Sequence, residues 1–187
     1  LKFAKDPYDI ERYNRVLNSS ARLVATLEKR SVQEVLEQYQ DNMNHVSPIS
    51  AADAAVFQDG KVLLIKRADN GRWAFPGGLV EAGETLAEAT QRELFEETNV
   101  RGQVSDLLGI FDSRLWHSRT KSHMFICIFH VIMESTNPPS AGPETTDVGF
   151  FSEKNLPDLS PGHHLQVPFV FKQIRGESPI PYFDPTN

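Results

Sequence analysis

The sequence predicts an α+β fold, an α/β sandwich preceded by a helical hairpin, and three observations support this. Strand-like and helical segments follow residue 47 in the order strands, helix, strands, helix, which is typical of a sheet covered by helices. Residues 1–46 carry two helical periodicities. The 187 residues are 40% hydrophobic, which is enough for one sizeable core. We therefore expect a helical hairpin at 1–46 and a main domain at 47–187.

Apolar residues of the N-terminal segment recur at steps of three and four, as in amphipathic helices. The first stripe comprises Ile10, Tyr13, Leu17, Val24 and Leu27. Ser31 and Glu34 form a capping box that starts a second helix. The apolar face of that helix comprises Val32, Val35, Leu36, Tyr39 and Met43. Because two helices alone cannot bury both faces, we expect them to pack on the main domain or on a second copy of the chain.

The main domain begins with two strand-like runs, 51–57 and 61–66, separated by Gln58-Asp59-Gly60, which predicts a hairpin. Later segments with strand patterns are 101–113, 121–133 and 147–151. A short helix is expected at 152–156, and a final helix at 163–175 that is kinked or interrupted at Pro168.

The most charged stretch of the chain runs from Gly78 to Val100. Its only base is Arg92, and its acids are Glu81, Glu84, Glu88, Glu93, Glu96 and Glu97. This stretch therefore carries nearly all of the net charge of −6 of the whole chain.

The second half of the acidic stretch is predicted to be a helix that starts with a Thr85–Glu88 capping box. Helical spacing places Glu93, Glu96 and Glu97 on one side of it. Two like charges about 4 Å apart repel by roughly 4 kcal/mol at an effective dielectric near 20, so a compensating cation is expected. Hard oxygen ligands select Mg²⁺ or Mn²⁺. The alternative is a solvated acidic helix face.

The spacing of these residues resembles the signature of the Nudix hydrolases: Gly78, five residues, Glu84, seven residues, then Arg92-Glu93-Leu94-Phe95-Glu96-Glu97. The resemblance implies an α/β/α sandwich with a mixed sheet and a loop-helix-loop that holds a divalent metal against a pyrophosphate. Asn99 stands where the signature has glycine. Asparagine is the next best residue for a left-handed turn after a helix, so we expect an intact motif.

The resemblance extends beyond the motif. The segments 5–13 and 111–114 are similar to a bacterial Nudix subgroup with an N-terminal helical extension that acts on nucleoside diphosphates linked to another group X. ADP-ribose, CDP-choline and UDP-linked metabolites are such compounds. The implied function is an Mg²⁺-dependent hydrolysis to a nucleoside monophosphate and X-phosphate. The alternatives are a triphosphate-sanitising pyrophosphatase and a non-catalytic, Nudix-derived ligand-binding regulator.

The resemblance also implies site residues. The metal ligands would be Glu93, Glu96, Glu97 and the carbonyl group of Gly77, with Mg²⁺ or Mn²⁺ as the cofactor. Glu96 and Arg92 are also expected to serve catalysis, and Arg92 would orient the carboxylates through charge-assisted hydrogen bonds. Glu84 would either bind a further metal ion or brace the helix.

A base that activates the attacking water is expected outside the motif, because coordination lowers the proton affinity of metal-bound glutamates. Glu144 is the candidate: it follows a loop that contains Pro and Gly and precedes a strand. The alternative is that Glu144 is a solvated loop residue. The other downstream carboxylates are Glu134, Asp147, Glu153, Asp158 and Glu177.

The candidates for contacts to the distal parts of the substrate are Trp73, Phe75, Arg114 and Trp116, together with His117. An aromatic face stacks on a nucleobase, and an arginine pairs with phosphate. The alternative is that Phe75 belongs to the core and Trp116 anchors a loop. The pair His163-His164 is interpreted as the first turn of a helix rather than as a soft-metal site.

Composition limits the partners of the chain. The isoelectric point near 5.5 and the absence of a basic patch argue against nucleic acid, and no apolar run approaches a membrane span. Cys127 is the only cysteine, which is consistent with a reducing cytoplasm, and its apolar surroundings predict a buried strand residue. Because the chain starts with Leu1, we expect its natural N-terminus to lie upstream. The expected partners are a small nucleotide substrate and a second copy of the chain, in a homodimer formed by the N-terminal helices.

Overall fold

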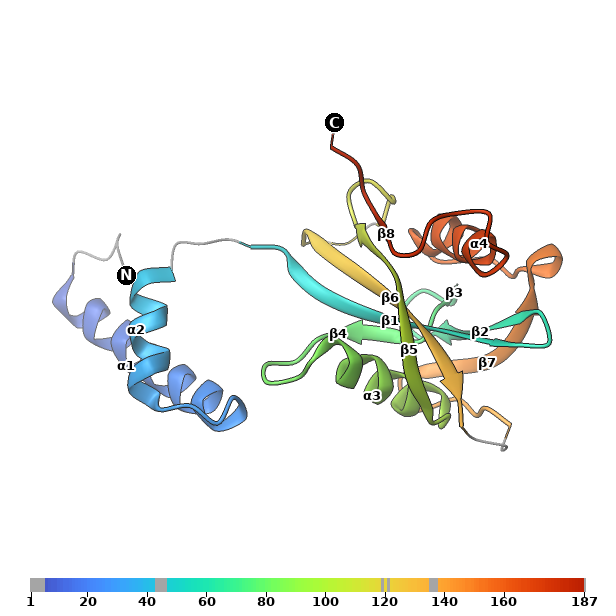
Figure 1. Cartoon of the computed structure of the whole chain (residues 1–187). Helices are drawn as coiled ribbons and strands as arrows, with labels where there is room; N and C mark the ends of the chain where they lie inside the picture. The colour runs from blue at the N-terminus through green and yellow to red at the C-terminus, as the bar shows by residue number, and fades with distance from the viewer. Residues whose placement is uncertain (1–5, 43–46, 119, 121, 135–137, 187) are drawn as a thin grey trace. The chain divides into compact units, whose positions relative to one another are not determined.

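A computed structural model of the chain describes residues 6–42, 47–118, 120, 122–134 and 138–186 (Figure 1). The predicted boundary region 43–46, with Met43 of the second apolar stripe, lies outside these residues, as does the side chain of Tyr39. The chain divides into one unit formed by Leu1–Ser47 with Glu81–Gly83 and another formed by Pro48–Val80 with Glu84–Asn187.

The N-terminal unit is a helical hairpin of α1 (Pro7–Leu27) and α2 (Val32–Asn42). The predicted capping box is confirmed, because the Ser31 N–H donates to Glu34 (2.9 Å) and the Glu34 N–H donates to the Ser31 hydroxyl (3.2 Å). The two helices meet through the buried residues Ala21, Ala25 and Val35. The predicted stripe of α1 is therefore split, since Leu17 is buried whereas its other members are exposed or only partly buried.

The other unit contains an eight-stranded sheet, counted over the described residues. Its strands are β1 (Ile49–Gln58), β2 (Lys61–Arg67), β3 (Trp73–Ala74), β4 (Gly77–Leu79), β5 (Gly102–Asp112), β6 (Met124–Met133), β7 (Thr145–Ser152) and β8 (Tyr182–Phe183). The order is β3-β2-β1-β6-β5-β8, with β4 paired to β1 and β7 to β2. The central pair β1–β6 is parallel and β5–β6 is antiparallel, so the sheet is mixed.

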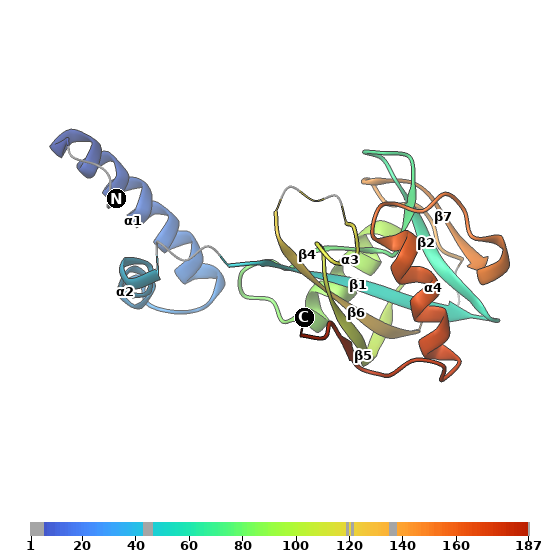
Figure 2. The same cartoon turned by 90° about the horizontal axis from the view of Figure 1, so that it is seen from above.

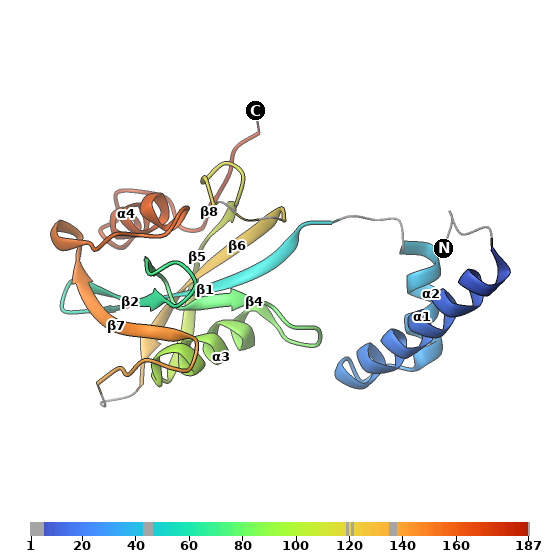
Figure 3. The same ribbon diagram turned by 180° about the vertical axis from the view of Figure 1, so that it is seen from behind.

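Two helices cover this sheet. Figures 1 and 3 show α4 (His163–Ile174) on one side of the strands and α3 (Leu86–Thr98) on the other, and Figure 2 shows α4 lying across them. One buried cluster joins Val167, Val170 and Phe171 of α4 to the strands, and a second joins Leu94 of α3 to the opposite strand residues. The predicted α+β sandwich with a mixed sheet is thereby confirmed.

Local sequence signals predicted several elements that the structure shows. The predicted hairpin turn is formed by Asp59 (φ 50°) and Gly60 (φ 71°), between the paired residues Gln58 and Lys61. A short 3-10 helix, η1, spans Glu153–Asn155. Cys127 is buried on β6, as predicted, and burial raises the pKa of its thiol to about 11.

Helix α4 runs through Pro168, so the predicted interruption there is wrong, and the alternative of a kink stays a prediction. Proline removes one helical hydrogen bond, but buried side chains before and after it, Val167 and Val170, hold both parts of the helix on the sheet. Among the described residues, no helix combines the length and apolar character that a membrane crossing requires.

Candidate active site

The loop before α3 is attached to the central strand of the sheet. Gly77 and Gly78 of β4 pair with Asp53 and Ala52 of β1, and the Ala54 N–H donates to the Pro76 carbonyl (2.8 Å). These pairings fix the glycine backbone directly beside the middle of β1.

Both glycines allow a close approach, and at Gly77 an added Cβ atom would also overlap the backbone of β1. A Cβ atom on Gly77 would overlap the Asp53 carboxylate, and one on Gly78 would overlap the Glu93 carboxylate. The loop is thus a cradle in which two carboxylates reach the main chain because no side chain blocks them.

Helix α3 begins and ends as its sequence predicts. Thr85 and Glu88 form the reciprocal capping box, which satisfies two orphan N–H groups of the first turn. Asn99 closes the helix in the left-handed conformation (φ 55°, ψ 16°), and its N–H donates to the Phe95 carbonyl (2.8 Å). The replacement of the family's glycine by asparagine therefore leaves the helix end intact.

Arg92 organises the acidic face of α3. Its guanidinium donates to Glu84 (2.7 and 3.0 Å), to Glu93 (2.8 Å), to Glu96 (3.1 Å) and to the Leu79 carbonyl (3.1 Å). These bonds raise the pKa of Arg92, with the bond to Glu84 as the largest cause. One arginine therefore ties the helix face to the preceding loop and orients the carboxylates beside the cradle.

Glu97 is a carboxylate of the site whose pKa is strongly raised. Burial, opposed by a hydrogen bond from the Gly77 N–H (2.8 Å), raises its pKa to about 8, and the negative charges of Glu93 and Asp53 contribute. Burial also raises the pKa of Glu93, while Arg92 opposes the shift. In the metal-free protein, burial thus disfavours the ionised form of both carboxylates, and a cation bound beside them would favour that form.

Several carboxylates face one cavity of about 910 Å³, whereas Glu96, a predicted metal ligand on the same helix, is not among the residues that line it. Asp53, Glu93, Glu97 and Glu144 all line it, together with Gly77 and Gly78 of the cradle. Arg67 and His163 also contribute to the wall, and Arg67 forms a bidentate ion pair with Asp69 (2.9 and 2.8 Å).

The donor set fits a hard divalent cation. Among the described residues, no three Asp, Glu, His or Cys side chains already stand in a metal-ligand arrangement. Four carboxylates nevertheless share the cavity, burial disfavours the charge of two of them, and the glycine cradle brings the carboxylates of Asp53 and Glu93 against the main chain. Carboxylate oxygens are the ligands that Mg²⁺ and Mn²⁺ prefer.

The loop that carries Glu144 is docked on the C-terminal end of α3. The Ser140 N–H donates to the Thr98 carbonyl (2.9 Å), and the Gly142 N–H donates to the Glu97 carbonyl (3.0 Å). The Thr145 hydroxyl donates to the same Glu97 carbonyl (3.1 Å). These bonds satisfy orphan carbonyls of the helix and hold Glu144 at the cavity wall.

The predicted substrate contacts are placed differently from one another. Phe75 lines the acidic cavity but is only 2% exposed. Arg114 lines a second cavity of about 690 Å³, and its guanidinium donates two hydrogen bonds to the Asp112 carboxylate. Within the described residues, Trp73 and Trp116 line neither cavity. The ring of Trp73 packs on Phe151, and the Trp116 indole N–H donates to Asp184 (2.8 Å). Their roles in substrate binding stay predictions.

Sequence reasoning missed several residues of the cavity wall, namely Asp53, Arg67, Ser118, Ser160 and His163. Asp53 has a clear signal in the sequence, because it is a single acid in an otherwise apolar strand. His163 was interpreted only as the start of a helix, which it is, but its ring also reaches Asp53 (3.2 Å).

Comparison with known proteins agrees with this geometry. The family model described as the NUDIX domain matches residues 48–171. The chain belongs to the Nudix family. This confirms the resemblance seen in the sequence, and the protein is a Nudix hydrolase. Members of this family generally use divalent metal ions.

Individual relatives of this Nudix hydrolase extend the comparison. YjhB of Bacillus subtilis is 28% identical over 186 residues, which cover 98% of this chain and 89% of that protein. The ADP-ribose pyrophosphatase of Methanocaldococcus jannaschii is 37% identical over 122 residues, or 64% and 70% of the two chains. The crystal structure of a UDP-X diphosphatase superposes with a TM-score of 0.69 and 25% identity, and the match covers 95% of this chain and 88% of that one.

Proposed function

We propose that this Nudix hydrolase is an Mg²⁺-dependent pyrophosphohydrolase that cleaves a nucleoside diphosphate linked to X into a nucleoside monophosphate and X-phosphate. The observation that carries the proposal is the set of four carboxylates around the glycine cradle in one cavity. The likeness to an ADP-ribose pyrophosphatase and to a UDP-X diphosphatase supports a nucleotide-sugar substrate.

In this proposal Glu93, Glu96, Glu97 and the carbonyl of Gly77 would hold Mg²⁺ or Mn²⁺. The ion would supply charge neutralisation for the pyrophosphate and activation of the attacking water. Arg92 keeps the carboxylates in place through its bonds to Glu93 and Glu96. Glu97 is fixed from the other side by the Gly77 N–H.

Glu144 acts as the general base. Glu144 lies at the wall of the cavity, and its negative charge contributes to the raised pKa of Glu93 on the signature helix. It accepts a proton from the attacking water while the water oxygen bonds to one phosphorus. The bond from that phosphorus to the bridging oxygen breaks, and the two phosphate products leave.

The predicted substrate contacts then divide into two roles. We propose that Phe75 and Arg114 contribute from the cavity walls that they line. Trp73 and Trp116 act through the packing of the core next to the site, because their rings pack on Phe151 and Phe111.

A substrate screen with Mg²⁺ tests the activity. ADP-ribose, CDP-choline, UDP-sugars, dinucleoside polyphosphates and nucleoside triphosphates are incubated with the protein, and the products are separated by chromatography. The expected result is a nucleoside monophosphate and X-phosphate from a diphosphate ester. Turnover of triphosphates alone would instead assign the protein to the nucleotide-sanitising class.

We also propose that residues 9–44 mediate a homodimer. One face of α1 meets α2, while Tyr13, Val16, Leu23 and Leu27 remain 52–70% exposed. Their spacing of three, seven and four residues places them along one stripe of the helix, as in a helix–helix seam. A second copy of the chain provides the same stripe about a two-fold axis.

A further inference from the structure

Three buried polar atoms in the acidic cavity have no hydrogen-bond partner within the described part of the chain. They are the hydroxyl oxygens of Ser118 and Ser160 and the Nδ1 atom of His163. Ser160 is only 3% exposed, and all three residues line the cavity that holds the carboxylates. Buried polar groups are normally hydrogen-bonded, so we expect these three atoms to bind polar groups of a ligand. We call the three residues the hydroxyl cluster.

The backbone around the hydroxyl cluster is fixed. The Ser160 N–H donates to the Trp73 carbonyl (2.8 Å), and the Ser118 N–H donates to the Ser113 carbonyl (2.9 Å). Gly162 has φ of 89°, and a Cβ atom there would overlap the Ser118 hydroxyl. Ser118 therefore lies against the turn that starts α4, and only the hydroxyl groups of the two serines are left without a partner.

The third member of the cluster has a defined hydrogen-bonding role. The His163 Nε2 atom lies 3.2 Å from the carboxylate of Asp53, which is 5% exposed. Because a carboxylate accepts, we assign the ring proton to Nε2. In the neutral ring this leaves Nδ1 as an acceptor, and the ring is held by the edge-on contact with Phe75 (5.9 Å between centroids).

The cluster thus offers two hydroxyl groups, which donate and accept, and one ring nitrogen, which accepts. A phosphate group has acceptor oxygens that Nδ1 would repel, and a quaternary ammonium group forms no conventional hydrogen bond. A sugar hydroxyl both donates and accepts. We propose that Ser118, Ser160 and His163 bind the hydroxyl groups of a sugar ring of the substrate.

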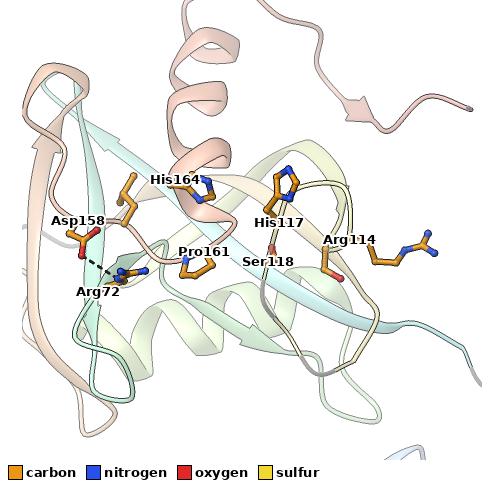
Figure 4. Close-up of a pocket in the computed structure, with 9 residues that line it drawn as sticks. Arg72, Arg114, His117, Ser118, Asp158, Pro161 and His164 are labelled. Atoms are coloured by element: carbon orange, nitrogen blue, oxygen red, sulfur yellow. Dashed lines mark ion pairs between the residues drawn. The ribbon is translucent and has the colours of Figure 1, made fainter.

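The position of the cluster agrees with this assignment. Ser118 and Pro161 line both the acidic cavity and the second cavity. In Figure 4 they lie between the Arg72–Asp158 ion pair (3.2 Å) and Arg114, whose side chain points outward. A sugar at this junction would lie beside a pyrophosphate at the carboxylates and would leave the second cavity for a distal group.

This inference rests on the proposed function and names its substrate class. Two sugars could supply the hydroxyl groups: the ribose of the nucleoside, or a sugar in X. CDP-choline carries only the first, and ADP-ribose carries both, so the two compounds distinguish the sources.

The test uses Ser118→Ala and Ser160→Ala in the full chain, with Ser105→Ala as the control. Ser105 is an exposed serine on β5 that lines neither cavity, and its hydroxyl donates to the His130 carbonyl (3.2 Å). Neither test substitution removes an existing side-chain hydrogen bond, so each variant should fold, and its melting temperature checks this. We expect KM for ADP-ribose to rise about 3–10-fold in both test variants, as for one lost hydrogen bond, with kcat within about twofold. Ser105→Ala should match the parent.

CDP-choline then identifies the sugar. A rise in KM for ADP-ribose alone assigns the cluster to the sugar of X, and a rise for both compounds assigns it to the ribose of the nucleoside. Unchanged KM for both compounds in both variants overturns the inference.

Direct binding separates this inference from the proposed activity. Calorimetry measures Kd for ADP-ribose in the Glu97→Gln background, with and without Ser160→Ala. If the parent hydrolyses none of the diphosphate esters but Ser160→Ala still weakens binding, the proposed function fails and the sugar site stands. Equal Kd values in the two proteins overturn the sugar site, whatever the catalytic result.

Discussion

Glu97 combines two properties that usually conflict in one side chain, a buried position and a charge that the proposed metal site requires. Its carboxylate accepts the Gly77 N–H and lies in the field of Glu93 and Asp53. A glutamine in its place would keep an acceptor oxygen for Gly77 and remove the charge. The stability of the metal-free protein and its activity are therefore expected to change in opposite directions.

We predict that Glu97→Gln lowers kcat at least about 100-fold, because a metal ligand is lost. Its melting temperature without metal should equal or exceed that of the parent, because burial raises the pKa of Glu97 from 4.5 to about 8 and so makes this carboxyl a cost to folding above about pH 4.5 that glutamine lacks. The expected shift is about 2–4 °C for each kcal/mol removed. Glu88→Gln is the control: it makes the same change in the same helix, and glutamine also serves in a capping box. Near-parental kcat for Glu97→Gln at ordinary Mg²⁺ concentrations would remove this residue from the metal site.

Asp112 gives a pH prediction of defined sign. Hydrogen bonds from the Arg114 side chain, with further bonds from the Arg114 N–H and His123, hold the pKa of this carboxyl well below its usual range. The native state therefore stays ionised where the unfolded chain, with a pKa of about 3.9, begins to bind a proton. Its stabilising contribution is present above about pH 4 and is lost as the pH falls.

Melting temperatures at several pH values test this prediction. The difference between the parent and Asp112→Asn should be largest near pH 7 and should shrink below about pH 4. Asp106→Asn, which changes a 66% exposed carboxylate on the same strand, should show little difference at any pH. A difference for Asp112→Asn that does not depend on pH would mean that ionic pairing is not its source.

At the scale of elements, the docked loop at 138–145 links the proposed base to the signature helix. We predict that Glu144→Gln lowers kcat about 10²–10⁴-fold, the usual range for loss of a general base, with little change in KM. Steady-state kinetics with the substrate found in the screen measures both constants. Glu134→Gln is the control, and activity of Glu144→Gln within a few-fold of the parent would assign the base elsewhere.

Gly142→Ala tests whether the docking of this loop positions Glu144. The added Cβ atom would overlap the Glu96 carbonyl oxygen, so the loop must move away from the helix. We expect a lower kcat together with a lower melting temperature, whereas Glu144→Gln should lower kcat alone. Gly149→Ala, where the added atom would meet only the ring of Phe151, is the matched control.

The sequence predicted those elements whose causes are local. The capping boxes at Ser31 and Thr85, the turn at Asp59-Gly60 and the left-handed Asn99 each depend on a few neighbouring residues. The strands β3, β4 and β8 have only two or three residues, and they exist because a partner strand pairs with them. No local pattern announces such strands.

The candidate site divides in the same way. The sequence predicts the carboxylates of Glu93 and Glu97 on one side of α3, because their spacing is set by the period of a single helix. The contact of His163 with Asp53 joins residues 110 positions apart, and Ser118 meets Gly162 across the cavity wall. The tertiary packing of α4 on the sheet creates these contacts, so no local pattern in the sequence signals them.

At the scale of the whole molecule, the exposed stripe of α1 predicts a homodimer. We expect the full chain to elute as a dimer and Val16→Glu/Leu23→Glu to elute as a monomer, because charge at the centre of an apolar seam opposes association. Light scattering coupled to size exclusion measures the mass. Asn18→Glu/Arg22→Glu, which alters two exposed residues off the stripe, should remain dimeric. A monomeric parent, or a dimeric stripe variant, would contradict the assignment.

The acidic cavity brings together segments with separate places in the chain. Its helical carboxylates lie between Glu93 and Glu97, whereas Ser118 and the turn at Ser160–His163 belong to two distant loops. If Ser118, Ser160 and His163 bind a sugar as proposed, substitutions in those loops would alter which sugar is accepted while the carboxylates of α3 stay unchanged. Substrate preference and hydrolysis would then be encoded in separate segments of the chain, and one could change by mutation without loss of the other.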